Sequence, residues 1–272
     1  MKNGKLTIGR IPYANLFPIF HYLDSECDQS DFRFVEGVPS QVNKMLREGE
    51  LDLSPSSSIE YLRNKDEYVL LPWFSISSSG PIKSILLFSR LPIKELGGRS
   101  IAVSSASETS TVLLKIILEE FLSLKCSYVP VEEHSVQEIL SSYPAMFHIG
   151  DTAMTEAKKL STNGNQSCAP YMYDLGEQWD KYTGLPFVYA LWLVRKKALS
   201  EKNGLIKKIS SELKNAKDYA STRFASIAKD APHKKWFTEE ELVRYWTTIS
   251  YDFTEKHLEG LKLFEKYAFK KY

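Results

Sequence analysis

The sequence predicts an α/β protein of two lobes, and two observations support this. Short apolar segments typical of buried strands alternate with helical patterns from residue 6 to residue 194. Beyond Leu199 the pattern is helical only. A helical run without strands of its own needs a sheet to pack on, so we expect the C-terminal helices to cover the first lobe.

The composition is that of an ordinary globular protein. The 272 residues are 43% hydrophobic and 25% charged, with a formal net charge of +1. This balance argues against nucleic acid or an anionic membrane as a partner, and no segment holds the ~18 consecutive apolar residues of a membrane span. The three cysteines are widely spaced, and the first residues lack a signal-peptide core. We therefore expect a cytoplasmic protein that does not insert into membranes.

The first lobe is expected to open with strands at Leu6–Ile8 and Phe32–Val35. A helix should follow, with Pro39 near its start and Gly49 at its end, because proline suits the first helical turn and glycine the C-terminal cap.

A short strand at Leu51–Leu53 then leads to a second helix start. Ser57 and Glu60 have the spacing of a capping box, with Ser57 as the N-cap and Glu60 reaching back. This places Ser56–Ser58 in a strand-to-helix turn.

The second lobe repeats the alternation of strand and helix. Ser77–Gly80 is expected to form a polar turn, and Asp151 is a plausible N-cap for a helix at Thr152–Leu160. A largely apolar helix is expected at Glu108–Leu122. The expected strands are Ile82–Phe88, Ile101–Val103, Met146–Ile149 and Phe187–Val194.

Three patterns define the C-terminal helices. An apolar stripe runs from Leu205 to Phe224, and Thr238 with Glu241 forms a capping box that opens a helix. A last helix should begin at about Thr254 and turn three apolar residues inward: Leu258, Leu261 and Phe264.

The chain is expected to cross between lobes near Phe88–Leu91 and to return near Phe187–Leu191. Lobe one would comprise residues 1–88 and 192–272, and lobe two residues 89–191. This is the architecture of a periplasmic-binding protein, with a ligand cleft between the lobes.

The turn after the first strand has the composition of a ligand loop. Pro12 and Pro18 restrict its shape, and Tyr13 and Asn15 supply an aromatic ring and an amide. Open α/β sheets bind small molecules at such strand ends. The alternative is a plain connection between strand and helix.

Small hydroxyl side chains gather at three further strand-to-helix turns. Helix N-termini offer free N–H donors and partial positive charge, so these turns suit a carboxylate or phosphate. The alternative is that the serines are ordinary N-caps, and Glu108 would compete with an anion locally. The candidate binding residues are Ser57, Ser58, Ser105, Thr109, Ser110, Gly150 and Asp151.

No nucleotide-binding, hydrolase or metalloprotease motif occurs in the chain. His148 ends a strand and could reach a ligand, although a structural histidine is the alternative. We expect neither a metal nor a cofactor.

Several segments together resemble the chorismate dehydratase family of the futalosine route to menaquinone. Their order and spacing carry the resemblance, which covers nearly the whole chain. Ala14 departs from it, because the family more often has leucine there. The matching segments are residues 9–18, 39–52, 57–61, 80–89, 149–151, 174–179 and 183–188, with a weaker match at 251–253 and 260–261.

The resemblance implies a type II periplasmic-binding-protein-like fold and an enzyme that dehydrates chorismate to 3-[(1-carboxyvinyl)oxy]benzoate. It places Ser84 and Asn15 at the reacting ring as catalytic residues, with Ser57, Thr109 and Ser110 holding the carboxylates of this dicarboxylate substrate. The alternatives are a sister enzyme that acts later, on cyclic dehypoxanthinyl futalosine, a non-catalytic small-anion binding protein and an effector-sensing domain.

Overall fold

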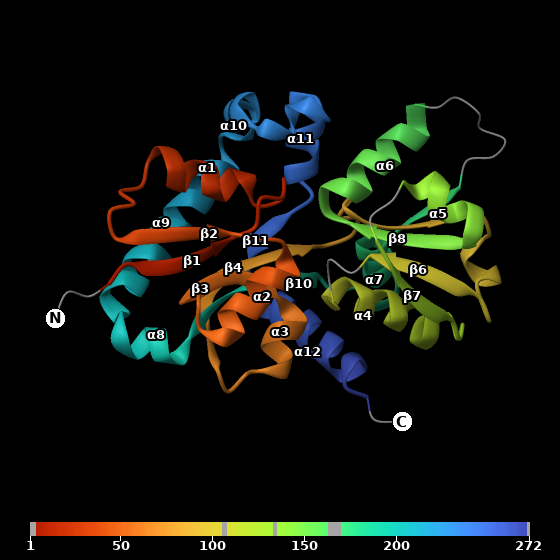
Figure 1. The fold of residues 1–272 in the computed structure, drawn as a ribbon, viewed down its shortest axis with the longest axis horizontal. Helices are drawn as coiled ribbons and strands as arrows, with labels where there is room; N and C mark the ends of the chain where they lie inside the picture. The colour runs from red at the N-terminus through yellow and green to blue at the C-terminus, as the bar shows by residue number, and fades with distance from the viewer. Residues whose placement is uncertain (1–3, 105–107, 133–134, 163–169, 271–272) are drawn as a thin grey trace. The chain divides into compact units, whose positions relative to one another are not determined.

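The structure is a computed structural model that describes residues 4–104, 108–132, 135–162 and 170–270 (Figure 1). The chain forms two compact units. Unit 1 comprises Met1–Ile76 and Tyr189–Phe253, and unit 2 comprises Ser77–Val188 and Thr254–Tyr272. The predicted α/β class is confirmed, because each unit has a sheet covered by helices.

Unit 1 is built on a six-stranded sheet of order β11-β4-β10-β3-β1-β2. β1 is parallel to both β2 and β3, while β10 is antiparallel to β3. The strands are β1 (Leu6–Arg10), β2 (Phe32–Glu36), β3 (Leu53–Ser57), β4 (Tyr68–Ser78), β10 (Phe187–Arg195) and β11 (Ser250–Asp252).

The helices of unit 1 cover both faces of this sheet. The chain moves from β1 outward to β2 and then back past β1 to β3, so right-handed crossovers place α1 and α2 on opposite faces (Figure 1). The helices are α1 (Phe17–Ser25), α2 (Pro39–Glu48), α3 (Ser58–Arg63), α8 (Lys196–Glu201), α9 (Asn203–Ser221), α10 (Phe224–Asp230) and α11 (Glu239–Trp246).

Unit 2 has a five-stranded sheet of order β7-β6-β8-β5-β9. β6 is parallel to β7 and β8, and β5 is antiparallel to β8 and β9. The strands are β5 (Ile85–Ser89), β6 (Ser100–Ser104), β7 (Ser127–Val131), β8 (Ala145–Ile149) and β9 (Tyr171–Asp174). The helices are α4 (Glu108–Lys115), which continues as a π-helix (Ile116–Phe121), α5 (Val136–Ser142), α6 (Gly150–Thr162), α7 (Leu175–Thr183) and α12 (Glu255–Ala268).

The last helix, α12, belongs to unit 2, whereas the sequence analysis assigned it to the first lobe. The ring of Phe264 packs edge-on against Phe187 and Trp179 at centroid distances of 5.0 and 6.5 Å. Gly260 lies directly against the Pro186 carbonyl oxygen, where any Cβ would clash. The helix therefore packs where unit 2 offers aromatic surface and a close backbone approach.

The chain leaves unit 1 earlier than expected but returns to it within the expected stretch, Phe187–Leu191. It leaves unit 1 after Ile76, within β4, and returns after Val188, within β10. The expected first crossing, at Phe88–Leu91, lies at the end of β5, inside unit 2. Ser77 and Ser78, expected in a polar turn, are buried residues of β4 because that strand runs on through them.

Most elements of the C-terminal region are confirmed, with two differences in which side chains turn inward. The Thr238–Glu241 capping box is present, and Leu261 and Phe264 are buried. Leu258 is instead 37% exposed, and Ile206 takes the inward position expected for Leu205.

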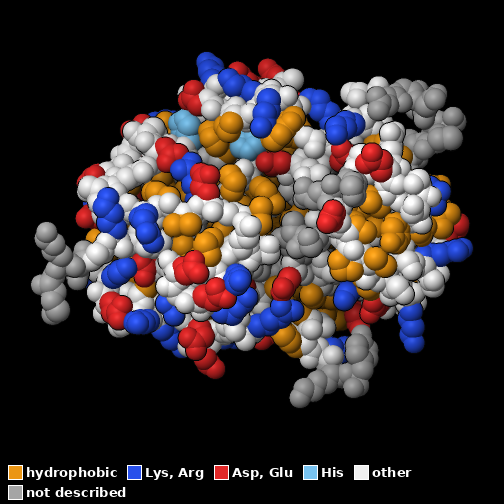
Figure 2. Space-filling model, in the orientation of Figure 1, with side chains coloured by type: hydrophobic (Ala, Val, Ile, Leu, Met, Phe, Trp, Pro, Cys, Tyr) orange, Lys and Arg blue, Asp and Glu red, His pale blue; other side chains and the backbone are white. Residues whose placement is uncertain are grey.

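Two surface findings bear on the partner classes. No helix among the described residues is long and apolar enough to cross a membrane. On the face drawn in Figure 2, basic and acidic side chains are interspersed, as the net charge of +1 predicts.

Candidate active site

The predicted residues of unit 1 follow two neighbouring strands. β1 and β3 are adjacent and parallel, so their carboxyl ends lie at one edge of the sheet. Tyr13 and Asn15 follow β1, while Ser57 ends β3 and Ser58 begins α3. This edge is where open α/β sheets bind ligands.

The loop that carries Asn15 is fixed by its backbone. The Trp246 indole donates a hydrogen bond to the Ala14 carbonyl at 2.8 Å, and the Tyr251 hydroxyl donates to the Asn15 carbonyl at 2.6 Å. Burial raises the pKa of Tyr251 well above its ordinary value, so this hydroxyl keeps its proton. Neither anchor was predicted, because both lie more than two hundred residues away from the loop in the chain.

The Asn15 side chain has an unused acceptor. Its Oδ1 atom is buried and has no hydrogen-bond partner among the described residues. A buried carbonyl oxygen without a partner is costly. This acceptor is therefore available to a hydrogen-bond donor from a molecule that binds at this edge of the sheet.

Ser57 is held by Asn43, which the sequence analysis did not select. The Asn43 amide donates to the Ser57 hydroxyl at 2.8 Å and accepts from the Ser57 backbone N–H at 3.3 Å. Asn43 lies in α2 beside the apolar residues Val42 and Leu46, and all three are buried. The sequence offers one indication of this role: the Asn43 amide lies within the apolar stripe of α2.

The capping box predicted for Ser57 and Glu60 is wrong. Ser57 occupies the N-cap position of α3, but its side chain makes no cap hydrogen bond. Glu60 instead forms a salt bridge with Arg47 and accepts from the Tyr68 hydroxyl at 2.8 Å. The buried Glu60 carboxylate turns toward these partners because Arg47 neutralises its charge and Tyr68 donates a hydrogen bond to it.

In unit 2 the predicted residues also gather at one sheet edge. β6 and β8 are parallel neighbours and end there, and the antiparallel strand β5 begins there. Ser84 precedes β5, and its carbonyl accepts a hydrogen bond from Gly150 N–H at 2.7 Å. Thr109 and Ser110 lie in the first turn of α4, beyond the end of β6.

These side chains are small, polar and buried. Ser84 and Ser110 are each 3% exposed, and Thr109 is 1% exposed. Asp151 is partly exposed and lies inside the first turn of α6, which begins at Gly150, so the expected N-cap position for Asp151 is wrong. Gly150 itself has a positive φ of 64°, which suits a residue without a Cβ. Ser105 lies outside the described residues.

His148 is fully buried in β8, at the centre of the sheet of unit 2. Among the residues that the structure describes, no group of three or more His, Cys, Asp and Glu side chains is placed to hold a metal ion.

Asp174 is an acidic group at the same edge. It ends β9, next to β5. Its carboxylate accepts hydrogen bonds from four backbone N–H groups: those of Ile82 and Lys83, before β5, and those of Gly176 and Glu177, in α7. Burial raises its pKa, and the four N–H donors oppose that rise. In the sequence, Asp174 stands out only as the first residue of the matching segment 174–179.

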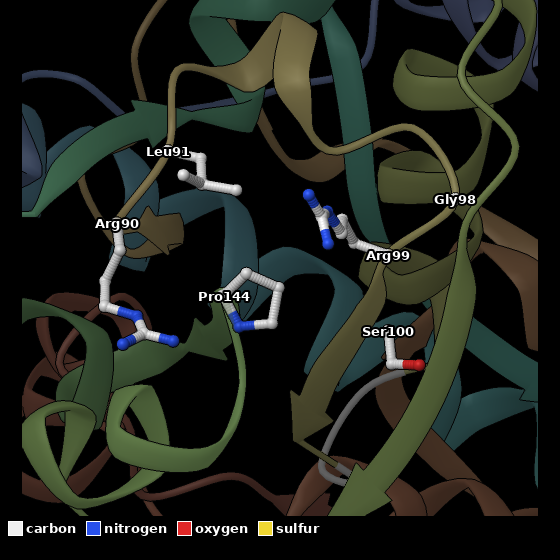
Figure 3. Close-up of a pocket in the computed structure, with 6 residues that line it drawn as sticks. All are labelled: Arg90, Leu91, Gly98, Arg99, Ser100 and Pro144. Carbon is white, nitrogen blue, oxygen red and sulfur yellow. The ribbon is translucent and has the colours of Figure 1, made fainter.

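A cavity of about 640 Å³ lies elsewhere in unit 2 (Figure 3). Its lining includes Ser100, which begins β6, and Pro144, which precedes β8. It therefore lies at the opposite edge of the sheet from Ser84 and Gly150, and we do not place the active site there. In Figure 3 the Arg99 guanidinium points toward Leu91, whereas the Arg90 guanidinium points away from Leu91.

Comparisons with known proteins identify both the fold and the family. A family described as "Menaquinone biosynthesis" matches residues 6–270. A protein of Thermus thermophilus named chorismate dehydratase is 30% identical, over 94% of this chain and 93% of its own. A second protein of that name, from Campylobacter jejuni subsp. jejuni, is 28% identical over 71% of this chain and 70% of its own.

Among solved structures, the alkanesulfonate-binding protein of Xanthomonas axonopodis pv. citri has a TM-score of 0.66 at 12% identity, covering 97% of this chain and 91% of its own. This likeness confirms the predicted periplasmic-binding-protein-like fold. The family match is nearly full length, and the Thermus relative aligns over almost all of both chains. The chain therefore belongs to the menaquinone biosynthesis family.

Proposed function

We propose that this protein is a chorismate dehydratase, a carbon–oxygen lyase that converts chorismate to 3-[(1-carboxyvinyl)oxy]benzoate and water. The observation that carries the proposal is the alignment with a relative of that name over 94% of this chain. The candidate site supports it with buried neutral hydroxyls at one edge of each sheet and with the Asn15 amide in unit 1.

The reaction needs little from the protein beyond positioning and charge stabilisation. Chorismate carries a ring carboxylate and an enolpyruvyl carboxylate. Removal of the ring proton next to the ether oxygen sends its electron pair through the diene to the ring carboxylate. Hydrogen-bond donors fixed there would stabilise the developing enediolate. Loss of the neighbouring hydroxyl, which leaves as water with a proton, then gives the aromatic ring.

Ser84 and Asn15 are proposed to contact the reacting ring. Ser84 supplies a buried hydroxyl, and Asn15 supplies an amide donor together with an acceptor that has no partner among the described residues. Ser57, Thr109 and Ser110 are proposed to hold the carboxylates. The remaining proposed substrate-binding residues are Tyr13, Ser58, Ser105, Gly150 and Asp151.

The proton acceptor is proposed to be the enolpyruvyl carboxylate of the substrate itself. A general base must lie within hydrogen-bond reach of the proton that it removes. The enolpyruvyl carboxylate meets this condition, because its ether substituent is attached to the ring carbon that loses the proton. The protein would act mainly by fixing the pose of the substrate. Asp151 is the alternative base, since it is a partly exposed carboxylate at the same edge as Ser84.

Purified protein mixed with chorismate tests the proposal, with ultraviolet absorbance and mass spectrometry as readouts. We expect enzyme-dependent loss of one water and formation of an aromatic carboxyvinyloxy-benzoate. Chorismate that remains intact but raises the Tm would make the protein a binding protein. Chorismate that neither reacts nor binds would favour the later-acting relative, to be tested on cyclic dehypoxanthinyl futalosine.

A further inference from the structure

The segment immediately before β5 has a backbone conformation that its sequence does not favour. Lys83 has a positive φ of 64° although it is not glycine. Residues with a Cβ rarely adopt this left-handed conformation, and they keep it only where surrounding contacts enforce it. The next residue is Ser84, so the conformation of Lys83 sets the direction from which the Ser84 side chain leaves the backbone.

Asp174 supplies the contacts that enforce this turn. One carboxylate oxygen, Oδ2, accepts from Ile82 N–H at 3.0 Å and from Lys83 N–H at 2.6 Å. The other, Oδ1, caps α7 by accepting from Gly176 N–H at 2.9 Å and Glu177 N–H at 3.2 Å. Oδ1 also accepts from Ile82 N–H, at 3.1 Å. One carboxylate therefore joins the turn before β5 to the start of α7.

We propose that Asp174 is a positioning residue for Ser84, because its carboxylate holds the left-handed turn at Lys83 from which Ser84 is presented. This inference rests on the catalytic role proposed for Ser84. Asp174 itself need not touch the substrate. Gly150, just after the end of β8, donates its N–H to the Ser84 carbonyl and so holds Ser84 itself. The Asp174 carboxylate holds the two residues that precede Ser84, Ile82 and Lys83.

The variant Asp174→Ser separates the two duties of this side chain. Serine is a good N-cap, so α7 keeps a capping hydroxyl, but its shorter side chain cannot also reach Lys83 N–H. Displacement of a reacting group by about 1 Å can cost a factor of ~100 in rate. We expect kcat to fall by about 10- to 100-fold, with a much smaller change in KM.

Two further variants make the test specific. Ser135→Ala removes the cap of α5, another N-cap of unit 2, where the serine accepts from Glu138 N–H. It should lower the Tm without changing kcat. Lys83→Gly should leave the wild-type enzyme active, since the Lys83 side chain is exposed. In the Asp174→Ser background it should restore part of kcat, because glycine adopts positive φ without a Cβ clash.

Amide hydrogen exchange at Ile82 and Lys83 measures the clamp without reference to activity. The inference predicts faster exchange at both amides in Asp174→Ser. Unchanged exchange would overturn it, and so would faster exchange with an unaltered kcat, or a Lys83→Gly substitution that restores nothing. A wild-type protein that leaves chorismate intact would overturn the proposed function instead, and the exchange data would still decide whether Asp174 holds the turn.

Discussion

At the scale of single residues, the proposed chemistry depends on neutral groups rather than on a tuned acid or base. Ser84 is buried, and Asn15 holds an acceptor without a partner among the described residues. Their neutral side chains can donate to a developing oxyanion without repelling the carboxylates of the substrate. Removing either donor should therefore affect the chemical step.

We predict that Ser84→Ala and Asn15→Ala lose most activity, whereas Asp151→Asn keeps a substantial part. Loss of one preorganised donor typically costs about 100- to 1000-fold in kcat. Asp151→Asn should keep activity because the substrate carboxylate, and not Asp151, is proposed to take the proton. Steady-state kinetics on chorismate measures all three, with circular dichroism to establish that each variant is folded.

The informative outcome is an Asp151→Asn protein that folds and binds chorismate but does not turn it over. That result would identify Asp151 as the base and remove the substrate-assisted route. Full activity in Ser84→Ala would argue against the proposed site of unit 2 as a whole.

At the scale of elements, the final helix shows how packing decides a helix's place. Its apolar stripe identifies it as a helix, but the stripe fits any apolar surface. The partners that unit 2 provides are Trp179 and Phe187, which meet Phe264 edge to face.

We predict that Phe264→Ala destabilises the protein by about 3–5 kcal/mol, because it removes a buried aromatic ring and leaves a cavity. Leu258→Ala is the matched control in the same helix and should change stability little, since Leu258 is exposed. Denaturant unfolding followed by intrinsic fluorescence measures both. Equal losses in the two variants would contradict the packing described for α12.

At the scale of the whole molecule, the proposed substrate-binding residues are divided between the two units. Asn15 and Ser57 belong to unit 1, while Ser84, Thr109 and Ser110 belong to unit 2. A ligand that binds both sets stabilises both, since binding to the native state shifts unfolding by mass action.

We therefore predict that chorismate slows amide hydrogen exchange in two separate regions, residues 12–16 of unit 1 and residues 82–84 of unit 2. Benzoate, which has one carboxylate, serves as the control and should protect less. Protection confined to one unit would show that the other set of residues does not bind substrate, and the assignment of roles would have to change accordingly.

Patterns along the chain were sufficient for most elements and for the family. Apolar segments predicted β1, β2, β6, β8 and β10, because a buried strand needs only a short apolar run. Pro39 and Gly49 marked the two ends of α2, since each restricts or permits specific backbone angles. β4 was not predicted, because its N-terminal part contains Pro72 and exposed residues, which are not typical of a buried strand.

Local pattern along the chain was enough to predict the fold class, the family resemblance and the small hydroxyl residues that follow the strands. The partners that hold these residues are visible only in the folded molecule. Asn43 pairs with Ser57, Tyr251 with the Asn15 loop and Asp174 with the turn before Ser84. These hydrogen bonds join residues that lie between 14 and 236 positions apart in the chain. Such bonds follow no periodic pattern, so the sequence does not indicate them.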